Sequence, residues 1–256
     1  FSVRAAGLRV LYQPLSEVIH FEGTTSARDV RQGGKAYQVV NRQKFLEKWS
    51  AVLANHRAPG ESPRLEKERS VRRRVLVIDS RTPMPDKDAG SADTVNYMRL
   101  LQGLGFKVTF IPADNFFADG RYTSALQEVG VECLYSPYVA SVNAHLAEQG
   151  MDYDLVFLCR ANNAARHVEN VRRYCPKARI VFYTVDLHFL REQRQAKLHG
   201  SAALARAAVR TKELELRTIR LSDATIVLSS TEHELLVREL PGASLFVIPL
   251  LCEIPG

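Results

Sequence analysis

The sequence contains few cysteines, and those it has lie far apart. Cys133, Cys159, Cys175 and Cys252 form no CxxC or CxxH pair. This spacing is typical neither of a zinc cluster nor of a disulfide-linked scaffold. We therefore expect a protein of a reducing compartment, the cytoplasm.

Long apolar runs and targeting signals are also missing. The longest apolar run, residues 245–251, contains Pro249, and it is far shorter than the roughly 18 residues that a membrane-spanning helix needs. The chain starts at Phe1 with no basic region and no cleavage pattern, so we expect no targeting signal and a piece of a longer protein. Membrane contact is expected only as peripheral contact through that longer protein, at the inner face of the membrane.

Three motifs of nucleotide and acyl chemistry are absent. The sequence has no GxGxxG fingerprint, no GxxxxGK[ST] phosphate loop and no GxSxG elbow. These absences disfavour a nicotinamide-dependent dehydrogenase or epimerase, an ATP site and a serine hydrolase.

What the sequence does contain is an average globular composition with a basic balance. Lys and Arg number 35 and Asp and Glu 28, a net charge of +7, and 46% of residues are hydrophobic. A basic balance suggests an anionic partner, and part of it lies in the run 64–74. No aromatic residues interleave this run, so we interpret it as a solvated linker and expect no nucleic-acid partner. Salt-dependent DNA binding through Arg72–Arg74 would contradict this interpretation.

The chain is long enough for one or two domains. Residues 8–13 and 16–21 read as two strands around Pro14, and residues 36–56 carry apolar residues at helical spacing. Two strands and one helix cannot build a sizeable core, so we expect 1–56 to be the end of a domain whose body lies upstream. Residues 57–73, with Pro, Gly, Ser and mixed charge, predict a linker.

Residues 74–256 alternate between short apolar runs and amphipathic stretches, which predicts a doubly wound α/β domain with a parallel, Rossmann-like sheet. One or two extra helices are expected within 190–222. The predicted strands are 75–79, 107–112, 131–135, 155–159, 180–184, 225–228 and 245–249, and the predicted crossover helices are 91–104, 122–129, 139–149, 164–174 and 231–240.

Ligands of such sheets bind beyond the carboxyl ends of the strands, which selects the candidate residues. Asp79 ends the first run, and Gly90 and Ser91 open the next helix, where backbone N–H groups can receive a phosphate or sugar oxygen. Ser91 as a simple helix cap is the alternative. Arg160 and Asn162 follow the fourth run and can grip a polar ligand.

Asp186 and His188 follow the fifth run, and a carboxylate beside an imidazole makes a general base. A structural histidine at the helix start is equally compatible with the sequence. Glu232, His233 and Glu234 near a later helix start are interpreted as solvated. His20, before a glycine-bearing segment, is either a metal ligand or an ordinary strand-end residue.

Two stretches carry a resemblance to known families. The pattern Pro-x-Ser-x-Val-x-His-x-x-Gly over 14–23, continued by 34–45, resembles the carboxyl-terminal end of bacterial family 2 glycosyltransferase domains of polysaccharide and O-antigen synthesis, which have the GT-A fold. Residues 75–79, the loop 83–91 and the DLHFLRE block at 186–192 look like the amino-terminal Rossmann-like half of a GT-B glycosyltransferase.

The resemblance implies a tandem glycosyltransferase that moves a sugar from a nucleotide-sugar donor to a glycan or lipid-linked glycan acceptor. It implies a divalent metal, Mg²⁺ or Mn²⁺, in the family 2 domain only, with His20 as a ligand and the Asp-x-Asp motif upstream; Asp86-Lys87-Asp88 stands in the wrong domain for that role. In the second domain it implies an acceptor-holding lobe, in which Asp186 or His188 is the best-placed base. The candidate substrate-binding residues of this lobe are Asp79, Gly90, Ser91, Arg160, Asn162 and Arg191. The chain by itself is expected to be inactive. A non-catalytic binding module in polysaccharide assembly remains the main alternative.

Overall fold

The computed structural model describes residues 1–8, 10, 17–19, 36–58 and 60–251. The chain divides into two compact units, residues 1–70 and 71–256, which are described separately. The boundary between them lies inside the segment 57–73. None of the helices in the described part of the chain combines the length and the apolar composition that crossing a bilayer requires.

The first unit contains helices α1 (Ser2–Ala5), α2 (Ala36–Leu53) and α3 (Pro63–Glu66). Helix α2 lies where the apolar spacing predicts it, with a kink at Trp49, and the Phe1 ring packs against Trp49 at 5.5 Å between centroids. The predicted strands 8–13 and 16–21 fall mostly outside the described residues, and Leu8, Val10 and residues 17–19 belong to no strand. His20 also lies outside the described residues.

The segment predicted as a linker contains local structure. Helix α3 begins at Pro63, and Glu66 at its end lies 3.5 Å from His56 Nδ1, 3.5 Å from Arg57 Nη1 and 3.7 Å from Arg69 Nη1. The Glu66 carboxylate thus contacts side chains that precede and follow α3, so part of the predicted linker has local structure.

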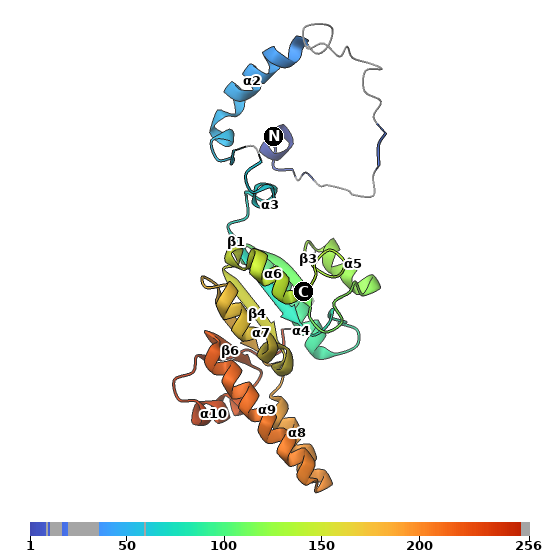
Figure 1. The fold of residues 1–256 in the computed structure, drawn as a ribbon, viewed down its shortest axis with the longest axis vertical. Coiled ribbons are helices and arrows are strands. Elements are labelled where there is room, and N and C mark those ends of the chain that lie inside the picture. The colour runs from blue at the N-terminus through green and yellow to red at the C-terminus, as the bar shows by residue number, and fades with distance from the viewer. Residues whose placement is uncertain (9, 11–16, 20–35, 59, 252–256) are drawn as a thin grey trace, which may run out of the picture. The chain divides into compact units, whose positions relative to one another are not determined.

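The second unit alternates strands and helices from β1 to β7 (Figure 1). The strands and helices agree with the predicted order, and the extra segment forms a two-helix hairpin. The elements are β1 (Arg73–Asp79), α4 (Ala89–Gly103), β2 (Phe106–Pro112), α5 (Gly120–Glu128), β3 (Glu132–Cys133), α6 (Val142–Gln149), the short 3₁₀ helix η2 (Gly150–Asp152), β4 (Leu155–Cys159), α7 (Ala161–Tyr174), β5 (Arg179–Tyr183), α8 (His188–His199), α9 (Ala202–Leu221), β6 (Ala224–Val227), α10 (Ser230–Glu239) and β7 (Leu245–Val247).

Seven parallel strands of the described residues form one sheet in the order β3-β2-β1-β4-β5-β6-β7. Strand β1 begins one residue before the predicted domain start, because Arg73 pairs with Phe106 in the sheet and its guanidinium lies 4.9 Å from that ring and donates to Leu104 O at 2.7 Å.

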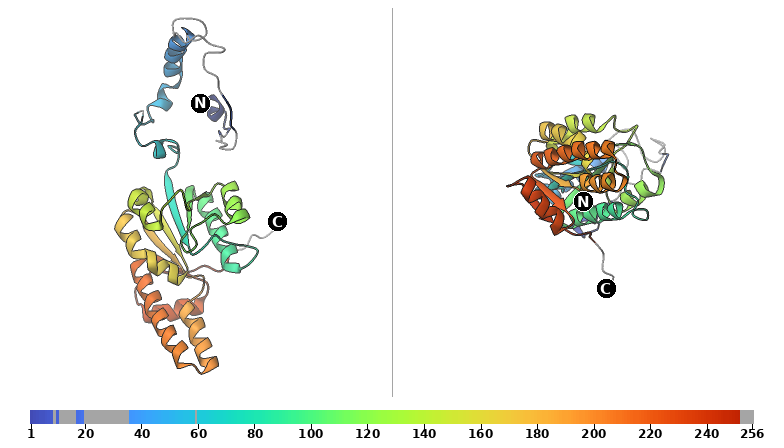
Figure 2. Two further views of the ribbon diagram at one scale, coloured as in Figure 1. Left: turned by 45° about the vertical axis from the view of Figure 1, so that its right-hand side comes forward. Right: turned by 90° about the horizontal axis from the view of Figure 1, so that it is seen from below.

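Helices cover both faces of the sheet (Figure 2). The side chains of β1, β2, β4, β5 and β6 alternate between two hydrophobic cores. In β1, Leu76 and Ile78 belong to the core that also contains residues of α6, α7, α9 and α10, whereas Val75 and Val77 belong to the core that contains residues of α4 and α5. All four are at most 1% exposed. Strands buried on both faces must be apolar throughout, which is why the runs show no polar alternation. The predicted doubly wound, Rossmann-like α/β fold is confirmed.

Candidate functional site

The strand order places a topological switch point between β1 and β4. From β1 the chain runs outward to β2 and β3, and it then returns to the other side of β1 to form β4. Connecting helices therefore diverge at the carboxyl ends of β1 and β4, where open α/β sheets bind ligands. Asp79 is the last residue of β1, and Arg160 follows β4 directly.

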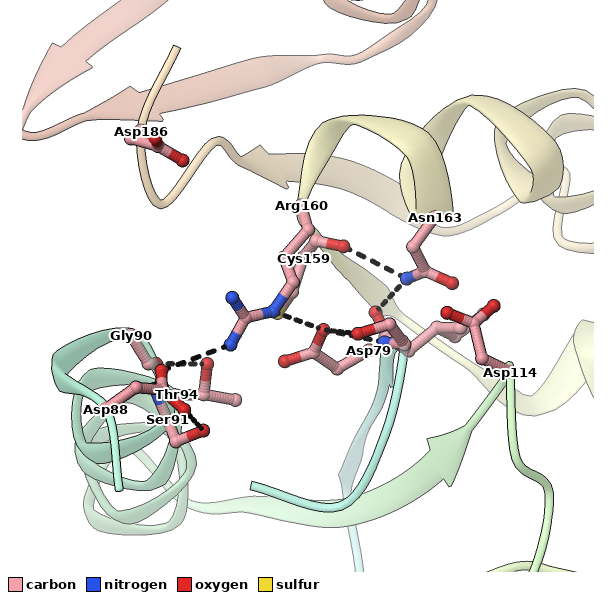
Figure 3. A network of polar contacts seen from close by, with 12 residues as sticks. Asp79, Asp88, Gly90, Ser91, Thr94, Asp114, Cys159, Arg160, Asn163 and Asp186 are labelled. Carbon is pink, nitrogen blue, oxygen red and sulfur yellow. Dashed lines mark hydrogen bonds and ion pairs between the residues drawn. The ribbon is translucent and has the colours of Figure 1, made fainter. Parts of the chain in front are cut away.

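The structure brings these two predicted residues together. Arg160 Nε donates to Asp79 Oδ1 at 3.0 Å, and Figure 3 shows the guanidinium between the end of β1 and the start of α4. Asp79 is only 1% exposed. Burial raises the pKa of Asp79, although the Arg160 charge and the Ser80 N–H oppose the rise. This carboxylate therefore depends on Arg160 for its charge balance.

The two oxygens of Asp79 are used differently. Oδ1 accepts from Arg160 Nε and from Ser80 N at 2.6 Å, whereas Oδ2 is buried and has no hydrogen-bond partner among the described residues. Buried carboxylate oxygens rarely lack a donor. Asp79 thus has capacity for one more donor, such as a hydroxyl group.

Arg160 connects β1 to the start of α4. Its Nη2 lies 3.6 Å from Asp88 Oδ1, and its side chain is 25% exposed. The backbone of Arg160 has φ of +66°, a conformation that costs about 1–3 kcal/mol and clusters at functional sites. The strained turn holds the guanidinium over the sheet edge, with part of it accessible.

Asp88, and not Ser91, caps helix α4. The Asp88 carboxylate accepts from Ser91 N at 2.7 Å and from Ser91 Oγ at 2.6 Å. The alternative in which Ser91 caps the helix is therefore wrong, because the helix begins at Ala89. Ser91 is 4% exposed, so its hydroxyl stabilises the turn.

Gly90 is required for a close approach between two loops. A Cβ at Gly90 would lie 2.7 Å from Val185 Cγ1 and 3.3 Å from Asp88 Oδ1. Val185 itself has φ of +66°, which is an outlier for a β-branched residue. Absence of a side chain at Gly90 thus lets the loop that carries Asp186 approach α4.

The substitution Gly90→Ala should displace this loop. Because the new Cβ overlaps Val185, we expect a loss of about 1–3 kcal/mol of stability and a shift of the Asp186 amide resonance. A matched control is Gly103→Ala, since a Cβ there meets nothing within 4 Å. Unchanged resonances around Asp186 in Gly90→Ala would contradict the expected displacement.

Asp186, His188 and Arg191 also lie together, as the sequence predicts for Asp186 and His188. Asp186 Oδ1 is 3.1 Å from His188 Nε2, and Arg191 Nη1 donates to Asp186 Oδ2 at 2.6 Å. The side chains of Asp186, His188 and Arg191 are 37%, 15% and 61% exposed. Burial raises the pKa of Asp186, but the hydrogen bond from His188 and the charges of His188, Arg191 and Arg160 outweigh it and hold the pKa below its ordinary value. This carboxylate is ionised at neutral pH and fixes the imidazole.

His188 is held in place by a residue that was not predicted from the sequence. Glu215 of α9 is 0% exposed, and its two oxygens accept from the backbone N–H groups of His188 and Phe189, both at 3.0 Å. These N–H groups belong to the first turn of α8 and have no partner within that helix. Burial raises the pKa of Glu215 to about 7, although both N–H groups and His188 oppose the rise.

Other predicted and unpredicted residues surround the site. Asn162 is exposed, and its neighbour Asn163, which is 1% exposed, instead donates to Ile78 O at 2.9 Å and Cys159 O at 3.0 Å. Asn163 thus joins the ends of β1 and β4.

The Cys159 thiol at the end of β4 is buried. Burial raises the pKa of this thiol, with Asp79 adding to the rise, so it is not a thiolate nucleophile.

Glu232 is not merely solvated. It accepts from Ser229 N at 3.1 Å and from Leu228 N at 3.0 Å, and Ser229 Oγ accepts from its backbone N–H, which completes a capping box at α10. The Ser-x-x-Glu signature was available in the sequence.

Metal-ligating side chains do not gather in the part of the chain that the structure describes. Groups of three or more His, Cys, Asp or Glu suited to a metal ion are not found there. Asp86 instead bonds Tyr122 at 2.7 Å and Arg121 at 2.5 Å, and Asp88 caps α4. The metal role expected for His20 falls outside the described residues.

Comparison of the chain with protein-family models, with curated proteins and with solved structures found no match in any of the three.

Proposed function

We propose that this chain is part of a glycosyltransferase that moves a sugar from a nucleotide-sugar donor to a hydroxyl of a growing bacterial surface glycan. Residues 71–256 would be the lobe that holds the acceptor. The observation that supports this proposal is the placement of Asp79, Arg160 and the Asp186–His188 pair at the carboxyl edge of three neighbouring strands, β1, β4 and β5.

These groups suit the chemistry of sugar hydroxyls. The accessible part of Arg160 can donate to a sugar hydroxyl, and the buried Asp79 carboxylate holds the guanidinium in place. Transfer requires that the acceptor hydroxyl lose its proton as it attacks the donor carbon, and a histidine oriented by a carboxylate is suited to take it. In the proposed reaction His188 is this base, and Asp186 orients the imidazole and stabilises its charged form.

The donor and the metal of the resemblance remain part of the proposal. A divalent ion bound through His20 and an upstream Asp-x-Asp motif would stabilise the leaving diphosphate in the family 2 domain. No role for a metal is assigned to residues 71–256, where the proposed steps use only side chains of the sheet edge.

Binding measurements on the 256-residue chain test the acceptor role. We expect saturation-transfer NMR to show binding of bacterial surface oligosaccharides. Arg160→Ala, measured where its β1 amides stay protected from hydrogen exchange so that the variant is folded, should weaken this binding at least about 10-fold, because losing a charged hydrogen bond costs roughly 1.4 kcal/mol or more. Arg166→Ala is the matched control, because Arg166 lies on the same helix and pairs with Asp114. Equal glycan binding by Arg160→Ala and wild type would contradict the proposed site.

Transfer activity of the parent protein separates an enzyme from a binding module. His188→Ala should reduce transfer by about 10²–10⁴-fold, the usual contribution of a general base, while glycan binding changes little. His233→Ala, in α10 and outside the candidate site, serves as control. Undiminished transfer in His188→Ala, with glycan binding retained, favours the alternative that this lobe only binds the glycan.

A further inference from the structure

The hairpin of α8 and α9 carries a concentration of positive charge that the proposed function does not use. Figure 1 and the left-hand view of Figure 2 show the hairpin extending beyond the sheet. We define its tip as residues 194–210. This segment contains four Lys or Arg residues and no Asp or Glu, in a chain whose net charge is +7.

The cations of the tip are uncompensated. The side chains of Arg194, Lys197, Arg206 and Arg210 are exposed, and none of these side chains has a hydrogen bond or an ion pair with any described residue. Just outside the tip the pattern changes, since Arg191 pairs with Asp186 and Lys212 pairs with Glu239 at 2.5 Å. Positive charge is therefore left available at the end of the hairpin, while the cations at its base are neutralised.

Apolar side chains are exposed among these cations. Leu198 is 83% exposed and Val209 53%. Between the two helices lies a shallow groove of about 600 Å³, whose lining is mainly small side chains and backbone. Its residues are Gln193, Ala196, Lys197, Gly200, Ser201, Ala202, Ala205 and Val209.

We propose that the tip of the α8–α9 hairpin docks on an anionic phospholipid membrane. Four unpaired cations complement an anionic surface, and each Lys or Arg near such a surface contributes about fivefold to binding. Leu198 supplies an apolar group that enters the headgroup region. A second copy of the tip would repel this one through like charges, and a projecting hairpin end fits a flat surface.

The tip lies on the same helix as His188, but the membrane proposal does not depend on the proposed transfer activity. His188 begins α8 and His199 ends it, which is a length of about 17 Å along the helix at 1.5 Å per residue. A docked tip would hold the sheet edge within that order of distance from the membrane, where a lipid-linked acceptor is found. The vesicle experiment contains no sugar, so its failure would leave the glycosyltransferase proposal untouched.

Vesicle co-sedimentation of the 256-residue chain tests the proposal. We expect binding to phosphatidylcholine vesicles that contain about one-third phosphatidylglycerol, little binding to pure phosphatidylcholine, and loss of binding as salt shortens the Debye length below about 10 Å. Replacing the four tip cations with glutamine should weaken partitioning at least about 50-fold, and Leu198→Ser should weaken it about 5-fold.

A matched control removes the same charge elsewhere. The substitutions are Arg173→Gln, Lys177→Gln, Arg220→Gln and Arg238→Gln, at exposed positions outside the tip. This control should retain binding to within about threefold, because a general loss of net charge acts weakly compared with loss at the contact surface. Three results would each overturn the proposal. They are equal loss of vesicle binding in both quadruple variants, unchanged vesicle binding in the tip variant, and binding of the wild type to duplex DNA but not to anionic vesicles.

Discussion

Replacing Arg160 with methionine is expected to destabilise the unit of residues 71–256 by about 3–5 kcal/mol at neutral pH, because it leaves a buried carboxylate without its counter-charge. Asp79 is 1% exposed and receives its only ion pair among the described residues from Arg160. Methionine keeps much of the side-chain volume, so the loss reports the charge more than the packing.

The pH dependence of the stability lost in Arg160→Met shows whether the ionised Asp79 carboxylate causes it. Burial already raises the pKa of Asp79, and without Arg160 the pKa rises further. A group whose folded-state pKa is raised contributes stability below its unfolded pKa and loses it as pH rises through the folded pKa. The cost of Arg160→Met should therefore grow from acid toward neutral pH, and adding Asp79→Asn should recover most of it.

Hydrogen exchange of the β1 and β4 amides is the suitable measurement, because the single tryptophan, Trp49, lies in the first unit and does not report on the second. Arg166→Met is the control, since Arg166 pairs with Asp114 at the surface and should cost less than about 1 kcal/mol. If Arg160→Met costs no more than this control at neutral pH, Asp79 does not depend on Arg160.

Removing the Glu215 carboxylate should have the second large effect. Glu215→Ala leaves two buried N–H groups of α8 without acceptors and a cavity in the hairpin, which together are expected to cost about 2–4 kcal/mol. His188 and Phe189 supply these N–H groups, so the start of α8 should exchange its amide hydrogens faster while β1 stays protected. Glu213→Ala, at an exposed position on the same helix, should change stability by less than about 0.5 kcal/mol.

Glu215→Gln separates the charge from the contacts. Because the pKa of Glu215 is raised to about 7, the wild-type protein loses stability as pH rises from the ordinary glutamate value toward 7, at a rate approaching 1.4 kcal/mol per pH unit. Glutamine does not titrate. The stability deficit of Glu215→Gln relative to wild type should thus narrow over this interval, and a constant deficit would show that the carboxylate does not titrate there.

Sequence pattern was sufficient for the sheet and its helices. The runs within β1, β2, β4 and β5 are short and mainly apolar, and the helical spacing between them favours parallel strands joined by crossovers. The sequence pattern was less reliable for the extent of β3, because only Glu132 and Cys133 of the predicted strand 131–135 pair in the sheet.

The candidate site was predicted in parts. Asp79, Arg160, Asp186 and His188 were identifiable because each follows a strand, and strand ends meet at one edge of a parallel sheet. The pairing of Asp186 with His188 was predicted from their closeness in the chain, whereas the ion pair of Arg160 with Asp79 was not, since it depends on the strained turn at Arg160. Spacing along the chain carries no information on which loops approach each other across the edge.

The sequence alone thus determined the fold class, the order of strands and helices along the chain, and the sheet edge that carries the polar residues, because these follow from local periodicity and from the handedness of crossovers. Only the tertiary structure decided that Glu215 is buried. Its surroundings on α9 alternate charged and apolar residues as an exposed helix would, and burial arises only because α8 folds back on α9 and places its unpaired N–H groups beside the carboxylate.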